Sequence, residues 1–359
     1  MGGRSGEHEV SIISANSVIN ALDKKKYQVV PIGITKNGQW ISGSGTVRLL
    51  KQDSPTPILD KILLPDPRQK SLISLKSRKK ASRPLDVIFP VLHGTYGEDG
   101  KIQGLLELAD IPYVGSGVLG SAVAMDKIIQ KKLFIQSGFK TPDFIFFNKS
   151  EWIKQQLKII RQIIKKLGLP VFIKPANLGS SVGISKVKDK KLIKKAVNEA
   201  LRYDLRIIVE KAVSHGREIE CAVLGNDQPV ASAPGEIVPG DEFYSYQDKY
   251  INNRMRTIIP APISLQQIKS IQNSAVAVFK LLDLKGLARV DFFIDQSGQV
   301  LLSEVNTMPG FTSISMYPKL WEYSGLPYSK LLDKLIDLAL ERHQQKNQLK
   351  FSYRLKPKI

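Results

Sequence analysis

Acidic and amide side chains alternate along two neighbouring segments near the C-terminal end of the sequence. Arg289 and Asp291 are two residues apart in one segment, and Glu304 and Asn306 are two apart in the next. Alternate residues of a β-strand point to the same face, so each pair shares a face. Oxygen donors in small number suit Mg²⁺ when nucleotide phosphates and water complete its shell. We predict a metal site here, beside an arginine suited to developing negative charge.

This site requires a β-hairpin. Segments 287–294 and 299–305 are rich in β-forming residues, and the turn sequence Asp295–Gly298 joins them. The hairpin brings the two polar pairs together and turns the apolar residues to the other face, namely Val290, Phe292, Leu302 and Val305. An exposed polar hairpin face without a ligand is the alternative interpretation of the same pattern.

A lysine and a glycine-rich loop suggest phosphate binding. Lys174 ends the apolar segment 171–174, and the small residues of 179–183 follow. Such residues let backbone N–H groups approach phosphate oxygens closely. No Gly-Lys-Ser/Thr sequence closes the loop, so it is not a P-loop. An ordinary turn is the alternative, and Lys127, which begins a helical stretch, would by itself be a surface lysine.

Four further segments could contribute polar groups. Residues 207–211 form an apolar strand ending in Glu-Lys, which could present its edge to an adenine, and residues 2–11 open with glycines before a helix. Residues 93–100 follow a buried strand, where open α/β sheets bind ligands. Residues 244–250 form a polar loop that could fold over a site. Each has a plain structural alternative when taken alone.

Composition limits the class of protein. A chain of 359 residues with 42% hydrophobic residues suits two or three lobes. It has no apolar run of about 18 residues and no signal-peptide pattern, so we expect no membrane span. The single cysteine, Cys221, cannot form an internal disulfide and is interpreted as a buried apolar residue. We therefore expect a cytoplasmic protein.

The net charge of +20 raises the possibility of a nucleic-acid partner. In the predicted helix 151–167, however, lysines alternate with an apolar set that we expect to be buried: Ile153, Leu157, Ile160, Ile164 and Leu167. The lysines then form a solvated face, and few aromatic residues accompany the basic clusters. We expect no nucleic-acid binding.

The remaining pattern predicts alternating strands and helices. Strands are expected at 27–34, 85–92, 171–174 and 207–211, and helices at 102–109, 190–201 and 329–342. Ser264 and Gln267 form a capping-box pattern that opens another helix. Residues 36–83 are polar, Pro-rich and basic, and we expect long loops there.

The order of these motifs resembles the D-alanine–D-alanine ligases of the ATP-grasp superfamily. The resemblance runs from Gly2 to about Glu341, through the stretches GGRSGEHEVS, HGTYGEDG, YVGSGVLGSAVAMDK, LPVFIKPANLGSSVGISKV, VEK, DKY, ARVDFF and EVNTMPGFTSIS. It implies an α/β, three-lobed ATP-grasp fold with an N-terminal Rossmann-like parallel sheet. The implied parts are residues 1–120, a central lobe at 121–212, a C-terminal lobe at 213–345 and a basic tail at 346–359.

The resemblance also implies roles for individual residues. The ATP-binding residues would be Lys127, Lys174, Gly179, Ser181, Glu210, Lys211, Val213, Glu218 and Lys249. Asp291, Glu304 and Asn306 would hold two Mg²⁺ ions, with Mn²⁺ as an alternative. The segment before Glu218 looks one residue longer than in some relatives.

The substrate residues follow from the same resemblance. Glu7, backed by Ser180 and Tyr250, would bind the ammonium group of the first D-alanine. Arg289 and the Gly310 N–H would stabilise an oxyanion. The second D-alanine's carboxylate would meet the Ser315 side chain and the Met316 backbone, and His93 would lie beside the substrate.

The implied activity is ATP-dependent formation of D-alanyl-D-alanine through an acyl phosphate, for peptidoglycan synthesis, by an enzyme that is commonly a homodimer. Tyr250 after Lys249 favours this dipeptide over the products of ligases that use D-lactate or D-serine. Relatives begin with an apolar strand before Gly-Gly, whereas this sequence begins at Met1. We therefore expect the first strand of the N-terminal sheet to be missing, with a start site set too late as our hypothesis. An inactive paralogue is the alternative from another class.

Overall fold

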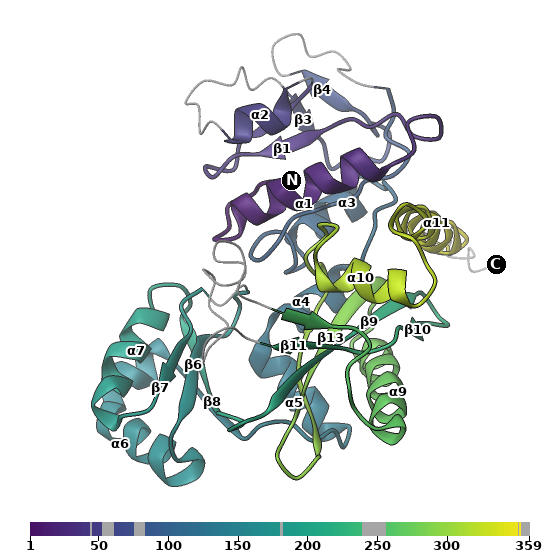
Figure 1. The fold of residues 1–359 in the computed structure, drawn as a ribbon. Coiled ribbons are helices and arrows are strands. Elements are labelled where there is room, and N and C mark those ends of the chain that lie inside the picture. The colour runs from purple at the N-terminus through teal and green to yellow at the C-terminus, as the bar shows by residue number, and fades with distance from the viewer. Residues whose placement is uncertain are drawn as a thin grey trace, which may run out of the picture.

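The computed structural model describes residues 1–43, 45–51, 61–74, 83–179, 182–238, 256–350 and 352. Figure 1 shows three groups of elements that follow one another along the chain. The N-terminal elements lie above the others in this view, the small sheet flanked by α6 and α7 lies at the lower left, and the larger sheet lies at the lower right.

The N-terminal part consists of short elements around a longer helix. They are α1 (His8–Ala21), β1 (Ile32–Ile34), β2 (Trp40–Ser42), α2 (Thr46–Lys51), β3 (Lys61–Leu63), β4 (Leu72–Ser74) and α3 (Lys101–Leu108). β1 pairs with β2 and β3 with β4, both antiparallel. Of the strand expected at 27–34, only the last three residues form a strand. The described residues between 36 and 83, where long loops were expected, contain one short helix and three short strands.

Among the described residues of this part, parallel pairing is limited to isolated bridges. One joins Gly2 to Ile34 and the other joins Ile88 to Tyr113, so the expected strand 85–92 is reduced to a single bridged position. Ile34 N donates to Met1 O at 2.9 Å, and Gly3 N donates to Ile34 O at 2.8 Å. These hydrogen bonds pair residues 1–3 with β1 as the end of a short parallel strand would. The expectation that the first strand of the N-terminal sheet is missing is not confirmed.

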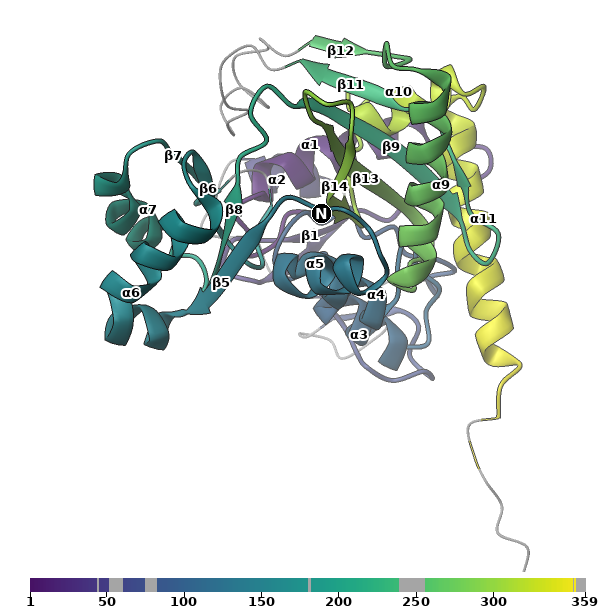
Figure 2. The same ribbon diagram turned by 90° about the horizontal axis from the view of Figure 1, so that it is seen from below.

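The central part builds a four-stranded antiparallel sheet flanked by α6 and α7, whereas its first two helices, α4 and α5, lie against the larger sheet (Figures 1 and 2). Its elements are α4 (Val118–Met125), α5 (Lys127–Gln136), β5 (Phe144–Asn148), α6 (Lys149–Leu167), β6 (Val171–Pro175), β7 (Ser185–Val187), the 3₁₀ helix η1 (Lys190–Leu192), α7 (Ile193–Ala200) and β8 (Arg206–Lys211). The strand order is β5-β8-β6-β7. Asn148 and Glu151 form a capping box that begins α6, and Gly168, with φ of 70°, ends it.

The buried face of α6 differs from the expected one. Ile153 and Leu157 are 66% and 71% exposed, whereas Trp152 is buried and its ring stacks on Phe147 with centroids 5.6 Å apart. Gln155 has a non-helical φ of −137°, so the helix is kinked there and a single helical phase does not describe its first turns. The burial of the large Trp152 ring over Phe147 determines which face packs on the sheet.

The C-terminal part contains the larger sheet. Its elements are β9 (Arg217–Gly225), β10 (Val230–Ala231), β11 (Gly235–Val238), β12 (Arg256–Ile258), α9 (Leu265–Leu281), β13 (Gly286–Ile294), β14 (Val300–Asn306), α10 (Met316–Tyr323) and α11 (Tyr328–Asn347). The order is β12-β11-β9-β13-β14, and β10 also pairs with β9. The predicted Ser264–Gln267 capping box begins α9, and the predicted hairpin is β13–β14.

Helices cover both faces of this sheet (Figures 1 and 2). α9 packs on one face through an apolar cluster that includes Ile219, Cys221, Val290 and Phe292. On the other side, α10 and α11 bury Leu224 and Leu287 together with residues of α1. The remaining residues of that second face are polar, and this part of the sheet faces the central part of the chain. Among the residues that the structure describes, no helix has the length and apolar character needed to cross a membrane.

Candidate active site

A row of charged side chains crosses three neighbouring strands of the larger sheet. Asp291 on β13 lies opposite Glu304 on β14 and, on its other side, opposite Glu220 on β9. Arg289 lies opposite Asn306. The alternating apolar residues of β13 belong to the cluster under α9, which confirms the predicted hairpin and its two faces. A bulge between Asp291 and Phe292 shifts the register beyond the row.

The acidic groups of this row are held by cations and an amide. Arg289 donates from Nε and Nη2 to the two oxygens of Asp291, both at 2.7 Å, and Asn306 Nδ2 donates to Asp291 Oδ2 at 2.9 Å. Lys127 Nζ lies 3.3 Å from Glu304 Oε2. Each of these partners neutralises or caps an oxygen that a divalent cation would otherwise take.

This donor set fits Mg²⁺ together with nucleotide phosphates. Asp291, Glu304 and the Asn306 amide all offer oxygens from one face, as Mg²⁺ prefers. No group of three or more His, Cys, Asp or Glu side chains in the described ranges is arranged as a metal site on its own. The two carboxylates and the amide therefore suit a cation whose coordination the phosphates and water complete.

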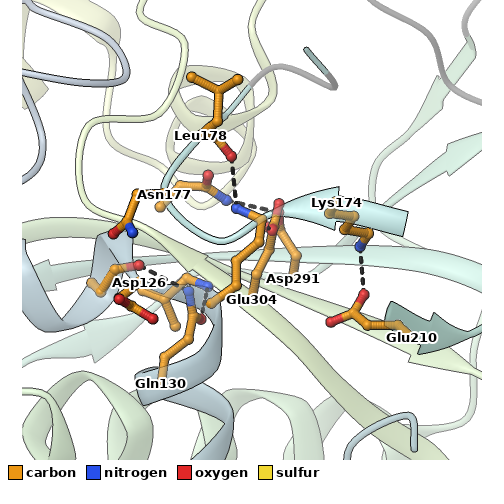
Figure 3. Close-up of polar contacts among 12 residues, drawn as sticks. Asp126, Gln130, Lys174, Asn177, Leu178, Glu210, Asp291 and Glu304 are labelled. Atoms are coloured by element: carbon orange, nitrogen blue, oxygen red, sulfur yellow. Dashed lines mark hydrogen bonds and ion pairs between the residues drawn. The ribbon is translucent and has the colours of Figure 1, made fainter. Parts of the chain in front are cut away.

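Lys127 reaches the site from the start of α5. Asp126 caps that helix by accepting from Ile128 N and Ile129 N, both at 3.0 Å, and pairs with Arg206. Lys127 Nζ donates to Leu178 O at 2.9 Å as well as contacting Glu304. Figure 3 shows Leu178, Glu304 and Asp291 gathered at this point. Lys127 thereby joins the loop after β6 to β14.

A buried ion-pair cluster lies at the end of β8. Glu210 is 5% exposed; its Oε2 lies 2.5 Å from Lys174 Nζ and its Oε1 lies 3.0 Å from Lys131 Nζ (Figure 3 shows the Lys174 pair). Burial acts to raise the pKa of Glu210, but the two lysines outweigh it and lower this pKa to about 2.

The two lysines respond differently to the same carboxylate. Burial lowers the pKa of Lys131 below its ordinary value despite the Glu210 charge. Burial also acts against the charged form of Lys174, but Glu210 and then Glu304 raise its pKa above the ordinary value. Lys174 therefore remains cationic between Glu210 and the acidic row, where a phosphate group would meet it.

The other expected adenosine residues border this cluster. Lys211 is exposed at the last position of β8, Val213 is half-buried in the connection to β9, and Glu218 lies on β9 opposite Phe293. Glu218 shares its face with Glu220, two residues along the strand. The structure thus brings these residues to the same side as Glu210, at the junction of the two sheets.

A second buried carboxylate cluster lies where α1 begins. Glu7 is 5% exposed, and glycines approach its Oε2 so closely that a Cβ on Gly94 or Gly179 would lie 2.3 or 2.8 Å away. Glu98 accepts from Gly94 N at 2.7 Å and from Met308 N at 2.9 Å. Burial, and then the charge of Glu7, raise the pKa of Glu98 to about 8. A buried and a half-buried carboxyl group with glycine neighbours suit an ammonium group.

His93 links this cluster to the segment after β14. Its Nδ1 lies 2.9 Å from Met308 O and its Nε2 lies 3.0 Å from Ser14 Oγ. Burial lowers the pKa of His93 to about 4, so the ring is neutral. His93 therefore fixes the position of Met308, whose N–H binds Glu98.

The segment after Met308 leads to the start of α10. Ser315 Oγ accepts from Thr312 N at 3.1 Å, and a Cβ on Gly310 would lie 2.9 Å from that Oγ. Ser315 precedes Met316, the first residue of α10, whose N-terminus favours an anion. The loop, Ser315 and the helix start thus form one polar corner beside the acidic row.

Four expected site residues lie outside the described residues: Ser180, Ser181, Lys249 and Tyr250. Four residues with evident structural roles at the site were not singled out from the sequence: Glu98, Gln130, Lys131 and Glu220. Glu98 stands in the HGTYGEDG motif, which was a usable signal. The contacts of the other three depend on which elements become neighbours.

Comparisons with known proteins agree with this arrangement. The family models "D-ala D-ala ligase N-terminus" and "D-ala D-ala ligase C-terminus" match residues 1–116 and 133–337. A D-alanine–D-alanine ligase from Natranaerobius thermophilus is 51% identical over 96% of this chain and 95% of its own length. Another, from Caldicellulosiruptor bescii, is 49% identical over 98% of this chain and 96% of its own length.

Solved structures give the same result. The D-alanine–D-alanine ligase from Coxiella burnetii has a TM-score of 0.81 at 39% identity, covering 97% of this chain and 95% of that one. The VanG D-Ala:D-Ser ligase from Enterococcus faecalis has a TM-score of 0.82 at 37% identity, covering 94% and 97%.

Two sheets that meet over an acidic row and two lysines define a mixed α/β protein of the ATP-grasp class. Within that class the models and relatives are specific. The chain belongs to the D-alanine–D-alanine ligase family, whose members are ATP-dependent ligases.

Proposed function

We propose that this chain joins two D-alanines to D-alanyl-D-alanine at the expense of ATP. The observation that carries the proposal is the row of Arg289, Asp291, Glu304 and Asn306, which Lys127 meets from the central part of the chain. Curated relatives along almost the whole chain are named D-alanine–D-alanine ligases, which supports the same reaction. Peptidoglycan synthesis is the pathway that uses this dipeptide.

In the first step, a carboxylate oxygen of one D-alanine attacks the γ-phosphorus of ATP, the bond to the β-phosphate oxygen breaks, and ADP leaves. An acyl phosphate results. Lys127 and Lys174 lie where they can hold phosphate oxygens. Gly179 and Ser181 would cover the same phosphates. The adenine would meet Glu210, Lys211 and Val213, and the ribose Glu218. Fixed cations of this kind stabilise phosphoryl transfer mainly by position and charge.

Asp291, Glu304 and Asn306 would hold two Mg²⁺ ions, or Mn²⁺ in their place, and the bound ions would neutralise charge on the phosphates. For this, Asn306 must present its amide oxygen, and Asp291 must share oxygens that now accept from Arg289 and Asn306. The oxygen-only donor set supports this assignment.

In the second step, the amine of the other D-alanine attacks the acyl carbon, and phosphate leaves from the tetrahedral intermediate. Arg289 and the Gly310 N–H would stabilise its oxyanion. Ser315 and the N–H of Met316 at the start of α10 would hold the second carboxylate. Water must be excluded because it would hydrolyse the acyl phosphate, and we assign Lys249 and Tyr250 to the covering loop.

The first D-alanine would be oriented by its ammonium group. Glu7, nearly buried and approached by Gly94 and Gly179, offers a negative charge in a space that these two glycines border. We propose that Ser180 and Tyr250 support Glu7 there, and that His93 keeps the neighbouring loop in place through Met308.

Products with D-lactate or D-serine are the alternative within the family, because one similar structure is named a D-Ala:D-Ser ligase. The more similar curated relatives, at 51% and 49% identity, are named D-alanine–D-alanine ligases and favour the dipeptide. We further propose three lobes at 1–120, 121–212 and 213–345 with a tail at 346–359, a homodimer, and action in the cytoplasm, where ATP is available.

The test is phosphate release from ATP and Mg²⁺ with D-alanine, L-alanine, D-lactate or D-serine, and identification of each product by mass. Turnover with D-alanine alone, matched by D-alanyl-D-alanine, is the expected result. A mixed product with D-lactate or D-serine would contradict the specificity, and no turnover with any of them would contradict the activity. Asp291→Asn should abolish turnover, whereas the exposed-surface control Asp227→Asn should not.

A further inference from the structure

Glu220 is a buried acidic residue of the row that the reaction described above does not use. It lies on β9, is 7% exposed, and stands directly opposite Asp291. Its neighbours on β9, Ile219 and Cys221, point into the apolar cluster under α9, so Glu220 points to the polar face. Glu220, Asp291 and Glu304 therefore form one line of carboxylates across β9, β13 and β14.

Such a line requires cations between its members. Directly opposed side chains on paired strands are roughly 5 Å apart at Cβ, so like charges repel strongly in a water-poor site. Arg289 supplies the compensation, with Nε 3.2 Å from Glu220 Oε2 and 2.7 Å from Asp291 Oδ1. Lys127 compensates Glu304 at 3.3 Å. Arg289 thus stands between two carboxylates that come from different strands.

The two carboxylates are not equivalent in the proposed reaction. Asp291 accepts from Arg289 with both oxygens, and the same oxygens are the proposed metal ligands. A divalent cation draws on those lone pairs and weakens their hold on the guanidinium. Glu220 is anchored on β9, beside the hairpin, and its pairing with Arg289 does not compete with the proposed ligand set.

We propose that Glu220 is the positioning residue that keeps Arg289 aligned with the reacting carboxyl group after Asp291 has turned to the metal. A guanidinium carries five N–H donors, so it can bind a carboxylate along one edge and donate to an oxyanion from another. The charge of Glu220 also keeps Arg289 from being drawn wholly toward the phosphates. This inference rests on the proposed function of Arg289 and adds the residue that orients it.

The sheet offers a matched control on its other face. Glu236 on β11 is also 7% exposed, and its two oxygens accept from Nε and Nη2 of Arg217, both at 2.7 Å. It lies opposite Ile219, so it points away from the acidic row. Glu236→Gln removes a buried carboxylate paired with arginine in the same sheet, without touching the site.

The test compares Glu220→Gln and Glu236→Gln in steady-state assays of dipeptide formation. We expect E220Q to lower kcat by about tenfold to hundredfold, as a misplaced catalytic group does, with KM for ATP and D-alanine changed by less than about threefold. E236Q should lower the melting temperature and leave kcat within about twofold. Glu220→Asp, which keeps the charge but shortens its reach, should fall between wild type and E220Q.

Two further measurements separate positioning from the other roles. In an Arg289→Lys background, E220Q should lower kcat by less than about twofold. If Glu220 acts through Arg289, the effects of the two substitutions are not additive. Mn²⁺ affinity, measured by electron paramagnetic resonance with ADP present, should be the same in E220Q and wild type.

Several outcomes would overturn the inference. These are a wild-type kcat in E220Q, an equal loss in the R289K background, or a loss of Mn²⁺ affinity, which would make Glu220 a metal ligand. If E220Q does not fold, E220D must still show the lowered kcat, and a wild-type value there would also overturn it. A wild-type enzyme that makes no dipeptide would instead refute the proposed function, and the same assay reports that separately.

Discussion

Two carboxyl groups at the site have pKa values shifted in opposite directions. Two lysines hold the pKa of Glu210 below its ordinary value, whereas burial beside Glu7 raises the pKa of Glu98. A third carboxyl group, Glu220, is paired with Arg289. Identical side chains thus behave differently because the fold decides which charges surround them. These differences give tests at the scale of single residues.

Glu98 makes stability depend on pH in a direction opposite to that of most carboxylates. Its pKa is about 8 in the folded protein against 4.5 for the ordinary group, so the folded state binds more protons between those values. The free energy of unfolding therefore falls as pH rises from 4.5 to 8. Glu98→Gln should flatten this fall, as measured by urea denaturation at several pH values. Glu322→Gln, on the exposed side of α10, is the control, and an unchanged slope in E98Q would contradict the prediction.

Lys131 is expected to matter for stability because it pairs with a buried charge. Lys131→Met leaves Glu210 with Lys174 as its cation and removes the 3.0 Å contact. Removing one partner of a buried ion pair lowers the free energy of unfolding by about 3–5 kcal/mol. Because Lys174 still pairs with Glu210, we expect a loss at the lower end of this range, about 3 kcal/mol. Lys132→Met changes the exposed neighbour on α5 and should cost less than about 0.5 kcal/mol. Equal urea midpoints for the two variants would show that the pair is not stabilising.

At the scale of elements, β14 is an edge strand that α5 completes. Gln130 on α5 accepts from Val305 N at 3.0 Å and donates to Ala124 O at 2.8 Å. Val305 lies between Glu304 and Asn306 on β14. The Gln130 side chain (Figure 3) therefore fixes the part of the strand that carries both proposed ligands. A helix side chain here replaces the missing neighbouring strand.

Gln130→Met tests that role. It leaves a buried N–H and a carbonyl without this partner, at a cost of about 1–3 kcal/mol. Urea denaturation should show the loss, whereas Gln136→Met at the exposed end of α5 should not. A Q130M midpoint equal to that of Q136M would mean that another group takes over the strand edge.

Local patterns predicted some elements well and others poorly. The β13–β14 hairpin and the start of α9 follow from a turn and a capping box, which depend only on nearby residues. The buried face of α6 does not, because packing of Trp152 on Phe147 and a kink at Gln155 decide it. Glu220 was missed for a related reason, since alternation along β9 does not reveal that β13 lies beside it.

At the scale of the whole molecule, the site is shared among parts that are far apart in sequence. Lys127 joins α5 to β14, Met308 binds Glu98, and Arg342 on α11 donates to Tyr113 O at 3.1 Å. A reaction in two steps needs such a junction, because the phosphates, both amino acids and the oxyanion donors must meet in one water-poor space. We propose that one ATP drives peptide-bond formation there through an acyl phosphate.

The most direct measurement follows oxygen from substrate to product. D-alanine labelled with ¹⁸O in its carboxylate is incubated with the protein, ATP and Mg²⁺, and the released phosphate is analysed by mass. The acyl-phosphate route transfers one carboxylate oxygen to each phosphate, so the phosphate should carry one ¹⁸O for each D-alanyl-D-alanine formed. Unlabelled phosphate, released together with dipeptide, would contradict the mechanism.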